Sequence, residues 1–324
     1  VVRLAPADVP GPVPRLTAWC DLDVDGKPSV VVALSSDGYA RFALDGTLAD
    51  LDLWLPSAPA LRVVSLAVDA GALIEPATPQ TGLRWAVYGS SITHGAGLPP
   101  TRTWPAVVTR ALRRRTHNLG FDGNAHLDPL AAAALAELPV DLLTLELGVN
   151  VHLSGSMLER TFAPSVHGFL DRVRVAHPTS PIVVVSPLLC PARENVVPEH
   201  GMTLAQIRAI LAEAVRLRAD DALHHVDGRE LLDDLGLLPD GLHPSAAGHR
   251  EIARRYAELE SLLTADRFRF DRSLATSGPV ATAAATSTAA SPSQPIVPPA
   301  STPAVSSAGP IISCTATPSE NSDR

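Results

Sequence analysis

Hydrophobic and polar residues follow one pattern before about residue 80 and a different one after it. In the first part, short runs rich in β-branched residues are separated by Asp-Gly pairs that begin at Asp25, Asp37 and Asp45. Asp-Gly between such runs is typical of the tight turns of β-hairpins. The predicted strands are residues 29–34, 38–44, 50–55 and 61–68. The pattern therefore predicts a small, sandwich-like antiparallel β-domain over residues 1–80.

From residue 83 onward, short hydrophobic runs alternate with longer segments that have helical periodicity. The predicted strands are residues 84–88, 142–147, 182–186 and 225–226. The predicted helices are residues 104–115, 130–138, 162–176, 202–218 and 246–263. The run at 182–186 has no polar alternation, as expected of a parallel strand covered on both faces. The alternation predicts an α/β fold with a doubly wound parallel sheet, whose site lies beyond the carboxyl ends of its strands.

Composition changes again near residue 273, after which Ala, Ser, Thr, Pro and Gly make up most of the chain. Such a segment buries too little apolar area to offset the entropy lost on ordering it. We expect residues 273–324 to form a disordered tail whose deletion leaves stability and activity nearly unchanged. A mucin-like stalk or a linker is the alternative interpretation of this composition.

The charge balance and the cysteines argue against several classes of function. The chain has 26 Lys and Arg against 34 Asp and Glu, a net charge of −8 without a long run of one sign. This balance argues against nucleic acid or an anionic membrane as the main partner. No hydrophobic run approaches the roughly 18 residues of a membrane-spanning helix. The cysteines are too scattered for a disulfide framework and lack metal-ligand spacing, so no metal site is expected.

Four segments that follow predicted strands carry residues suited to catalysis. After the first of these strands, a Gly-Ser-Ser turn that ends at Ser91 exposes a hydroxyl, and the following amides point to where an anion would bind. Residues 118–124 contain Gly120 and Gly123, which allow a ligand to approach the backbone closely. Taken alone, each of these two segments is more readily interpreted as an ordinary turn.

The other two segments supply polar side chains. Asn150 follows the strand at 142–147 and presents an uncharged amide suited to stabilising an oxyanion. Asp240 precedes His243 by three residues, so its carboxylate can lie on the same side of a turn and orient the imidazole. In isolation, a loop-capping Asn and a structural Asp–His pair are the commoner interpretations.

In this order, the four segments resemble those of the SGNH hydrolase superfamily, also called GDSL esterases and lipases. The resemblance covers about residues 83–265 and implies a flavodoxin-like parallel sheet. It implies that Ser91 is the nucleophile and that Asp240 and His243 complete a catalytic triad. It also implies an oxyanion hole, whose donors are the amides of Ser91 and Gly123 and the side chain of Asn150.

Two details concern how the chain matches the blocks of the superfamily. Gly123 is preferred to Gly120 because the second block reads Asn, four residues and then Gly, and Asn118 sets that register. The first block usually has Asp before the nucleophile, where this chain has Ser90. Because that residue is not part of the triad, the departure concerns the support of the loop rather than the reaction.

Further stretches resemble one branch of the superfamily, in which a β-domain precedes the catalytic domain. Residues 50–56 are similar to an Asp-Leu-Tyr signature of that β-domain. Residues 186–193, 203–208 and 226–229 are similar to the same branch. The branch suggests acetyl or other short acyl groups as substrate, on a carbohydrate or another small molecule.

The expected reaction is hydrolysis of an ester through an acyl-enzyme, with no metal or organic cofactor. The alternatives are an acyltransferase of small-molecule biosynthesis that uses the same Ser–His–Asp site, and a non-catalytic binding protein, against which the intact triad argues. His94 and His200 are candidate substrate contacts, although His94 is equally well interpreted as a polar rim residue. The oligomeric state is left open. The sequence shows no targeting segment, which slightly favours the cytoplasm and leaves the compartment open.

Overall fold

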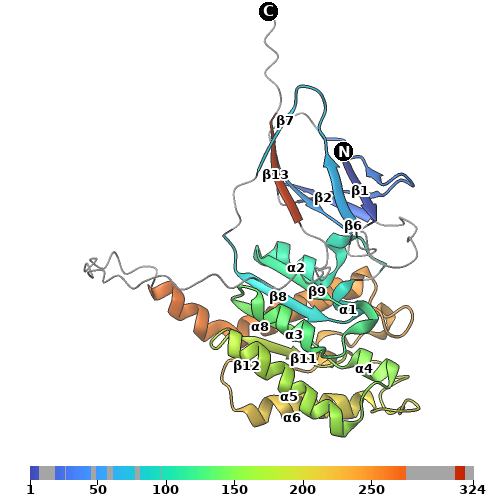
Figure 1. Cartoon of the computed structure of the whole chain (residues 1–324), viewed down its shortest axis with the longest axis vertical. Coiled ribbons are helices and arrows are strands. Elements are labelled where there is room, and N and C mark those ends of the chain that lie inside the picture. Colours follow the sequence, from blue (N-terminus) through green and yellow to red (C-terminus); the bar gives the residue numbers. More distant parts are fainter. Residues whose placement is uncertain are drawn as a thin grey trace, which may run out of the picture.

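A computed structural model gives the fold of the chain. It describes residues 1–6, 19–25, 27–44, 49–56, 61–76, 81–95, 97–274 and 311–317. A group of antiparallel strands lies at one end of the molecule, above an α/β part that contains the longer helices (Figure 1).

The α/β part is built on a five-stranded sheet in the order β12-β11-β10-β8-β9, in which every pairing is parallel. Its strands are β8 (Arg84–Gly89), β9 (Arg115–Gly120), β10 (Leu142–Glu146), β11 (Ile182–Val185) and β12 (Leu223–Val226). The order reverses after β8 and β9, as in a doubly wound sheet, so the predicted α/β class is confirmed. Several predicted boundaries differ from the structure. The helix expected to reach residue 115, for example, ends at Leu112, because Arg113 adopts a left-handed backbone conformation.

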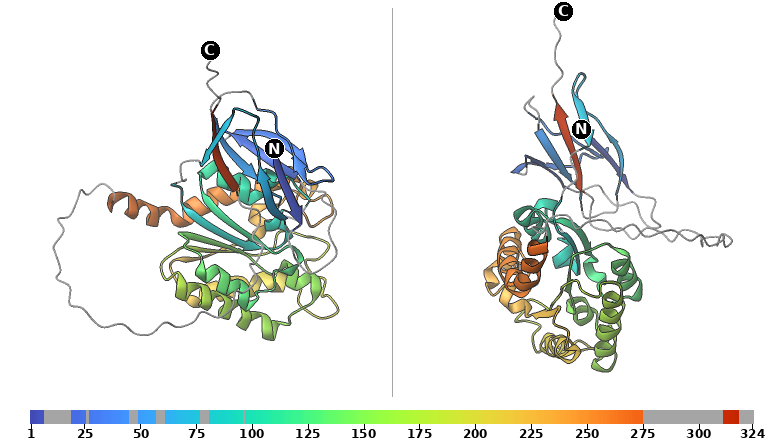
Figure 2. Two further views of the ribbon diagram at one scale, coloured as in Figure 1. Left: turned by 45° about the horizontal axis from the view of Figure 1, so that its top comes forward. Right: turned by 90° about the vertical axis from the view of Figure 1, so that its left-hand side faces the viewer.

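Helices cover both faces of this sheet, with α8 on one side and α5 on the other (Figure 2). One face carries α2 (Trp104–Leu112) and α8 (Ala246–Leu274). The other carries α3 (Pro129–Glu137), α5 (Glu159–Ala176) and α6 (Leu204–Arg218). Alternate residues of each strand feed the two hydrophobic cores, as Trp85 and Val87 do on one face and Ala86 and Tyr88 on the other.

The antiparallel strands form two sheets, in the orders β4-β1-β6 and β3-β2-β5-β13-β7. The strands before the parallel sheet are β1 (Val2–Pro6), β2 (Trp19–Val24), β3 (Lys27–Ala33), β4 (Tyr39–Ala40), β5 (Ala49–Trp54), β6 (Leu61–Leu66) and β7 (Leu73–Pro76). Both sheets contribute to one hydrophobic cluster, which includes Leu4, Leu22 and Leu53. The predicted small antiparallel region is therefore present, and β1, β2 and β7 are strands that the sequence patterns did not predict.

The structure differs from the predicted disordered tail in two places. Helix α8 continues to Leu274, and Ile311–Thr317 form strand β13 between β5 and β7. The register pairs Ile312 with Leu53 and Cys314 with Leu51. This strand is short and rich in β-branched residues, so the average composition of a fifty-residue window concealed it. The rest of the tail, residues 275–310 and 318–324, lies outside the described residues.

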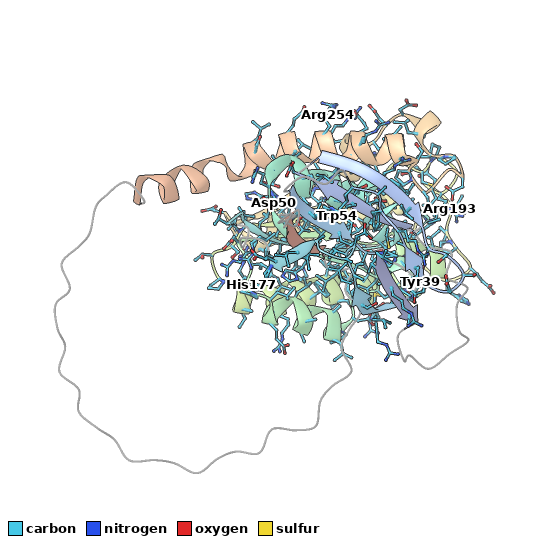
Figure 3. The ribbon with its side chains drawn as sticks, turned by 90° about the horizontal axis from the view of Figure 1, so that it is seen from above. Tyr39, Asp50, Trp54, His177, Arg193 and Arg254 are labelled. Atoms are coloured by element: carbon cyan, nitrogen blue, oxygen red, sulfur yellow. The ribbon has the colours of Figure 1, made fainter. Side chains whose placement is uncertain are left out.

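The antiparallel strands contact the α/β part at two helices that follow the predicted catalytic turn in the chain. The carboxylate of Asp21 on β2 accepts hydrogen bonds from the amide and hydroxyl of Thr101, in the 3-10 helix η1 (Pro100–Arg102). The guanidinium of Arg110 on α2 lies 6.0 Å from the ring centre of Trp54 on β5. Trp54 lies near the middle of the molecule when it is viewed from the side of these strands (Figure 3).

Candidate active site

Ser91 lies at the carboxyl end of β8, the strand between β10 and the edge strand β9, as the first residue of the short helix α1 (Ser91–His94). Ser90 caps this helix, because its side chain accepts a hydrogen bond from the amide of Ile92. Ser91 is the first helical residue, so its own amide has no acceptor within the helix and is available to a ligand. The local sequence thus places a hydroxyl and a donor amide of one residue at the sheet edge.

His243 and Asp240 lie in the loop that precedes α8, and the fold brings this loop to Ser91. The hydroxyl of Ser91 lies 2.8 Å from Nε2 of His243, although 152 positions separate the two residues. Nδ1 of His243 lies 2.6 Å from Oδ2 of Asp240. Since a carboxylate only accepts, Nδ1 carries the proton and Nε2 is left free to accept the proton of Ser91.

Asp240 also holds the backbone of its own loop. Its Oδ1 accepts hydrogen bonds from the amides of Leu242 at 2.9 Å and His243 at 2.7 Å. The hydrogen bond from the His243 ring and these two amides lower the pKa of Asp240 to about 2. Asp240 therefore remains a carboxylate at neutral pH and holds the imidazole through the hydrogen bond to Nδ1.

Two further segments bring donors toward this edge of the sheet. Asn150, in α4 (Val149–Ser154), is buried, and its Oδ1 accepts a hydrogen bond from the amide of Ala125 at 3.0 Å. That bond fixes the orientation of the side chain, so that its NH₂ group points away from Ala125. Gly123 lies in the 3-10 helix η2 (Asp122–Asn124), and a Cβ atom added to it would meet nothing within 4 Å.

Gly120 has a different environment from Gly123. Its amide already donates to Oδ1 of Asn118 at 2.9 Å, and an added Cβ atom would lie 2.3 Å from the amide nitrogen of His94. Gly120 therefore allows α1 to pack closely on the end of β9, and its amide is not available to an oxyanion. Of the two glycines, Gly123 has the more open surroundings, and its role as an oxyanion donor stays a prediction.

Comparison with known proteins places the chain in a family. The GDSL-like lipase/acylhydrolase family is matched over residues 87–251, a range that includes Ser91, Gly123, Asn150, Asp240 and His243. The chain belongs to this family. None of the curated proteins compared with it matches.

Two solved structures with a similar fold are an acyltransferase and an esterase. The salicylyl-acyltransferase SsfX3 from a tetracycline biosynthetic pathway is 31% identical, with a TM-score of 0.68, and the match covers 81% of this chain and 78% of that one. A family two carbohydrate esterase from Clostridium thermocellum, solved with cellohexaose, is 17% identical, with a TM-score of 0.59 and coverage of 81% and 88%. The sequence resemblance to the SGNH superfamily is thus confirmed.

A buried carboxyl group supports the turn at the point where this chain departs from the GDSL pattern. Oε2 of Glu146, at the end of β10, accepts hydrogen bonds from the amide and the hydroxyl of Ser90, both at 2.7 Å, and from the hydroxyl of Thr93 at 3.2 Å. Burial raises the pKa of Glu146. An Asp in place of Ser90 would bring a second carboxyl group to the same buried position. The chain thus combines a serine in the turn with a carboxyl group on the neighbouring strand.

Sequence analysis missed Glu146, although two signals pointed to it. It is an ionisable residue within a run of buried hydrophobic residues. It is also the last residue of β10, which pairs with β8, and the unusual Ser90 directly follows β8. The contact also explains Gly89, because a Cβ atom there would lie 2.5 Å from Oε2 of Glu146. Only a glycine allows the carboxyl group to approach the turn so closely.

The two histidines predicted to contact substrate lie in different surroundings. His94 ends α1, and its Nδ1 lies 2.8 Å from the carbonyl of Gly120, which holds the half-buried ring against β9. His200 is exposed, and its backbone carbonyl packs against Gly155 at the end of α4. Contact of either ring with substrate stays a prediction.

The described residues contain no group of three or more His, Cys, Asp or Glu side chains arranged to hold a metal ion. In the same part of the chain, no helix has the length and hydropathy needed to cross a membrane.

Proposed function

We propose that this protein is a serine esterase that hydrolyses short-chain acyl esters through an acyl-enzyme. The observation that carries the proposal is the continuous series of hydrogen bonds from Ser91 through His243 to Asp240, at 2.8 and 2.6 Å. It joins a hydroxyl, a base and a carboxylate in the order that nucleophilic catalysis requires. Membership of a hydrolase family supports the same reaction class.

In the first half of the reaction, the hydroxyl oxygen of Ser91 attacks the carbonyl carbon of the ester. The proton of Ser91 moves to Nε2 of His243, and the carbonyl oxygen takes up the negative charge of the tetrahedral intermediate. The amides of Ser91 and Gly123 and the NH₂ group of Asn150 would donate to that oxygen. Loss of one such donor costs about 3–4 kcal/mol of transition-state stabilisation. His243 then protonates the departing alcohol as the carbon–oxygen bond breaks, which leaves an acyl group on Ser91.

In the second half, water takes the place of the alcohol. His243 removes a proton from water as its oxygen attacks the acyl carbon, and returns a proton to Ser91 as the acid leaves. Asp240 does not change its protonation state in either half. It holds the ring and stabilises the imidazolium that forms twice in each cycle.

Covalent labelling with a fluorophosphonate tests this proposal. We expect one adduct, on Ser91, with a peptide map that leaves the neighbouring Ser90 unmodified. Ser90→Ala is the matched control, because it removes a hydroxyl from the same turn without removing the nucleophile, and it should still be labelled. Labelling of Ser90, or active protein that is not labelled at all, would contradict the proposal.

The substrate is proposed from the sequence resemblance to the branch with an N-terminal β-domain. On that basis we propose an acetyl or another short acyl group carried by a carbohydrate or another small molecule. A series of p-nitrophenyl esters of increasing chain length tests the acyl part. We expect kcat/KM to be highest for the acetyl or butyryl ester and to fall for longer chains.

Acyl transfer is the second candidate function, and the 31% identity to a salicylyl-acyltransferase favours it. The acyl-enzyme is the same, and an alcohol or amine replaces water as the group that attacks it. The ratio of ester to acid formed in the presence of an added alcohol separates the two reactions. An esterase yields acid chiefly, whereas an acyltransferase yields the new ester at alcohol concentrations far below that of water.

A further inference from the structure

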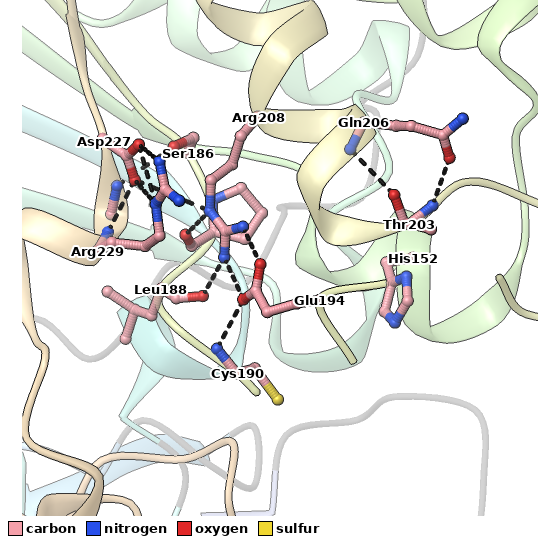
Figure 4. Close-up of polar contacts among 12 residues, drawn as sticks. His152, Ser186, Leu188, Cys190, Glu194, Thr203, Gln206, Arg208, Asp227 and Arg229 are labelled. Atoms are coloured by element: carbon pink, nitrogen blue, oxygen red, sulfur yellow. Dashed lines mark hydrogen bonds and ion pairs between the residues drawn. The ribbon is translucent and has the colours of Figure 1, made fainter. Parts of the chain in front are cut away.

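Three separate stretches that resemble the same branch of the superfamily meet around one buried side chain, that of Arg208. Residues 186–193 follow β11, residues 203–208 begin α6, and residues 226–229 follow β12. Arg208 is only 4% exposed. Figure 4 shows its guanidinium group among polar groups of the loop that follows β11 and beside Asp227.

The guanidinium of Arg208 binds the backbone of the loop that follows β11. Its Nε donates to the carbonyl of Pro187 at 2.8 Å, and its Nη2 donates to the carbonyl of Leu188 at 2.7 Å. Both Nη atoms also donate to the carboxylate of Glu194, in the same loop. The carboxylate of Asp227 lies 3.8 Å from Nε on the side of β12. The planar guanidinium of arginine can donate to all of these acceptors at once. A lysine would supply a single compact charge and could not replace these hydrogen bonds.

Glu194 links the Arg208 guanidinium to the backbone of Cys190. Its Oε1 accepts a hydrogen bond from the amide of Cys190 at 2.9 Å. Burial opposes charge on Glu194, but the hydrogen bonds from Arg208 and Cys190 outweigh it and lower the pKa of this carboxyl group. Glu194 is therefore a firm acceptor, and it fixes the backbone of Cys190 relative to the buried guanidinium.

Cys190 in turn contacts the loop that holds Asp240 and His243. Its thiol donates to the carbonyl of Gly241 at 3.0 Å. Gly241 lies between Asp240 and His243, whose side chains are 55% and 42% exposed. An exposed loop is easily displaced, and a displacement of about 1 Å at a catalytic group is enough to slow a reaction strongly. Burial raises the pKa of the Cys190 thiol, which keeps it protonated and able to donate.

We propose that Arg208 and Cys190 are positioning residues for the catalytic loop. Arg208 holds the loop after β11 through Pro187, Leu188 and Glu194, and Cys190 ties that loop to Gly241, so that His243 stays within reach of Ser91. This inference rests on the proposed function, because it assigns a role in the same Ser–His–Asp reaction. Neither residue touches the reacting atoms.

We test this proposal chiefly at Cys190, because replacing its thiol removes one hydrogen bond and leaves the contacts of Arg208 in place. We compare Cys190→Ala, which removes the donor, with Cys190→Ser, which keeps one. Cys20→Ala is the matched control, since Cys20 is also a buried free cysteine but lies on β2, away from the triad. For each variant we measure the fraction of the protein that a fluorophosphonate labels, which counts the active sites. On unlabelled protein we then measure KM, and kcat per active site so counted.

Loss of one hydrogen bond that orients a catalytic group predicts that Cys190→Ala lowers kcat per labelled site about three- to ten-fold, with KM nearly unchanged. Cys190→Ser should recover most of this loss, and Cys20→Ala should leave kcat unchanged. Arg208→Lys should lower kcat at least as much as Cys190→Ala. If Arg208→Lys fails to fold, the comparison of the two Cys190 variants still decides the outcome.

Two different failures can be told apart in this experiment. If Cys190→Ala keeps the kcat of the unaltered protein per labelled site, or if Cys190→Ser shows no recovery, the positioning role is wrong and the triad stands. If the unaltered protein is hydrolytically active but not labelled on Ser91, the proposed function itself fails, and the inference fails with it.

Discussion

Two regions of the molecule each place a carboxyl group at the proposed active site. An exposed loop places Asp240 beside His243, and the buried end of β10 places Glu146 beside the turn of Ser90 and Ser91. Each group accepts three hydrogen bonds from neighbouring amide, hydroxyl or imidazole groups. Their pKa values nevertheless move in opposite directions, down to about 2 for Asp240 and upward for Glu146. The number of donors therefore does not decide the charge.

Solvent makes the difference between these two regions. The side chain of Asp240 is 55% exposed, so hydrogen bonds act on a carboxylate that water already stabilises. Glu146 is 4% exposed, and its Oε1 has no hydrogen-bond partner among the described residues, so the charged form loses more in desolvation than its three donors return. The exposed group suits a catalytic role that needs a permanent charge, and the buried group suits support of the turn.

The largest effects are expected in the exposed region, from changes to His243 and Asp240. His243→Ala removes both general base and general acid, so kcat/KM should fall by at least about 1,000-fold and approach background. Asp240→Asn keeps the size of the side chain but loses its charge and can hold the imidazole in the wrong tautomer, so the loss should be smaller or equal. Both are measured on one activated ester, with circular dichroism as the control for folding. A His243→Ala protein that kept most of its activity would overturn the triad.

A smaller effect on activity is expected in the buried region, from Glu146→Gln. Glutamine keeps an oxygen that can accept from Ser90, so we expect kcat/KM to stay within about ten-fold of the unaltered protein. The larger consequence concerns stability and its dependence on pH. Because the folded-state pKa of Glu146 is raised, its contribution to stability is fully present below the ordinary carboxyl range and is lost as pH rises through the raised value.

Glutamine does not titrate, so Glu146→Gln should lack this loss. The melting temperature of the variant, relative to that of the unaltered protein, should therefore rise as the pH is raised above the ordinary carboxyl range. Glu251→Gln serves as the control, because Glu251 is a half-buried partner of two arginines and its pKa is lowered rather than raised. A difference in melting temperature that does not change with pH would show that Glu146 carries no such penalty.

The smallest effect on activity is expected from a change remote from both carboxyl groups. Truncation after residue 310 removes β13, which pairs with both β5 and β7. We expect the melting temperature to fall by several degrees because two strands lose their partner, while kcat/KM stays nearly unchanged. Truncation after residue 317 keeps β13 and is the matched control. Equal melting temperatures for the two truncated proteins would mean that β13 adds nothing to stability.

Much of the catalytic part was predictable because its signals are local. The hydrophobic run at Ile182–Val185 and the turn before Ser91 each occupy a few consecutive residues. The first was assigned correctly as a strand and the second as a turn at the end of a strand, although the short helix α1 that follows was not predicted. Strand β13 was missed for the opposite reason. Its seven residues favour a strand, but they stand alone in a segment of disorder-like composition, and their partners lie some 260 positions earlier in the chain.

By itself, the sequence determined the alternation of strands and helices and the presence of Ser91, Asp240 and His243 in segments that end at one edge of a sheet. Only the tertiary structure decided that the side chains of Ser91 and His243 lie 2.8 Å apart although 152 positions separate them in the chain. It also decided that the carboxyl group of Glu146 accepts a hydrogen bond from Ser90. Backbone propensity and hydrophobic periodicity act over a few residues, so they can be read locally. Distances between side chains, and the burial that sets their charge, depend on elements brought together from distant parts of the chain.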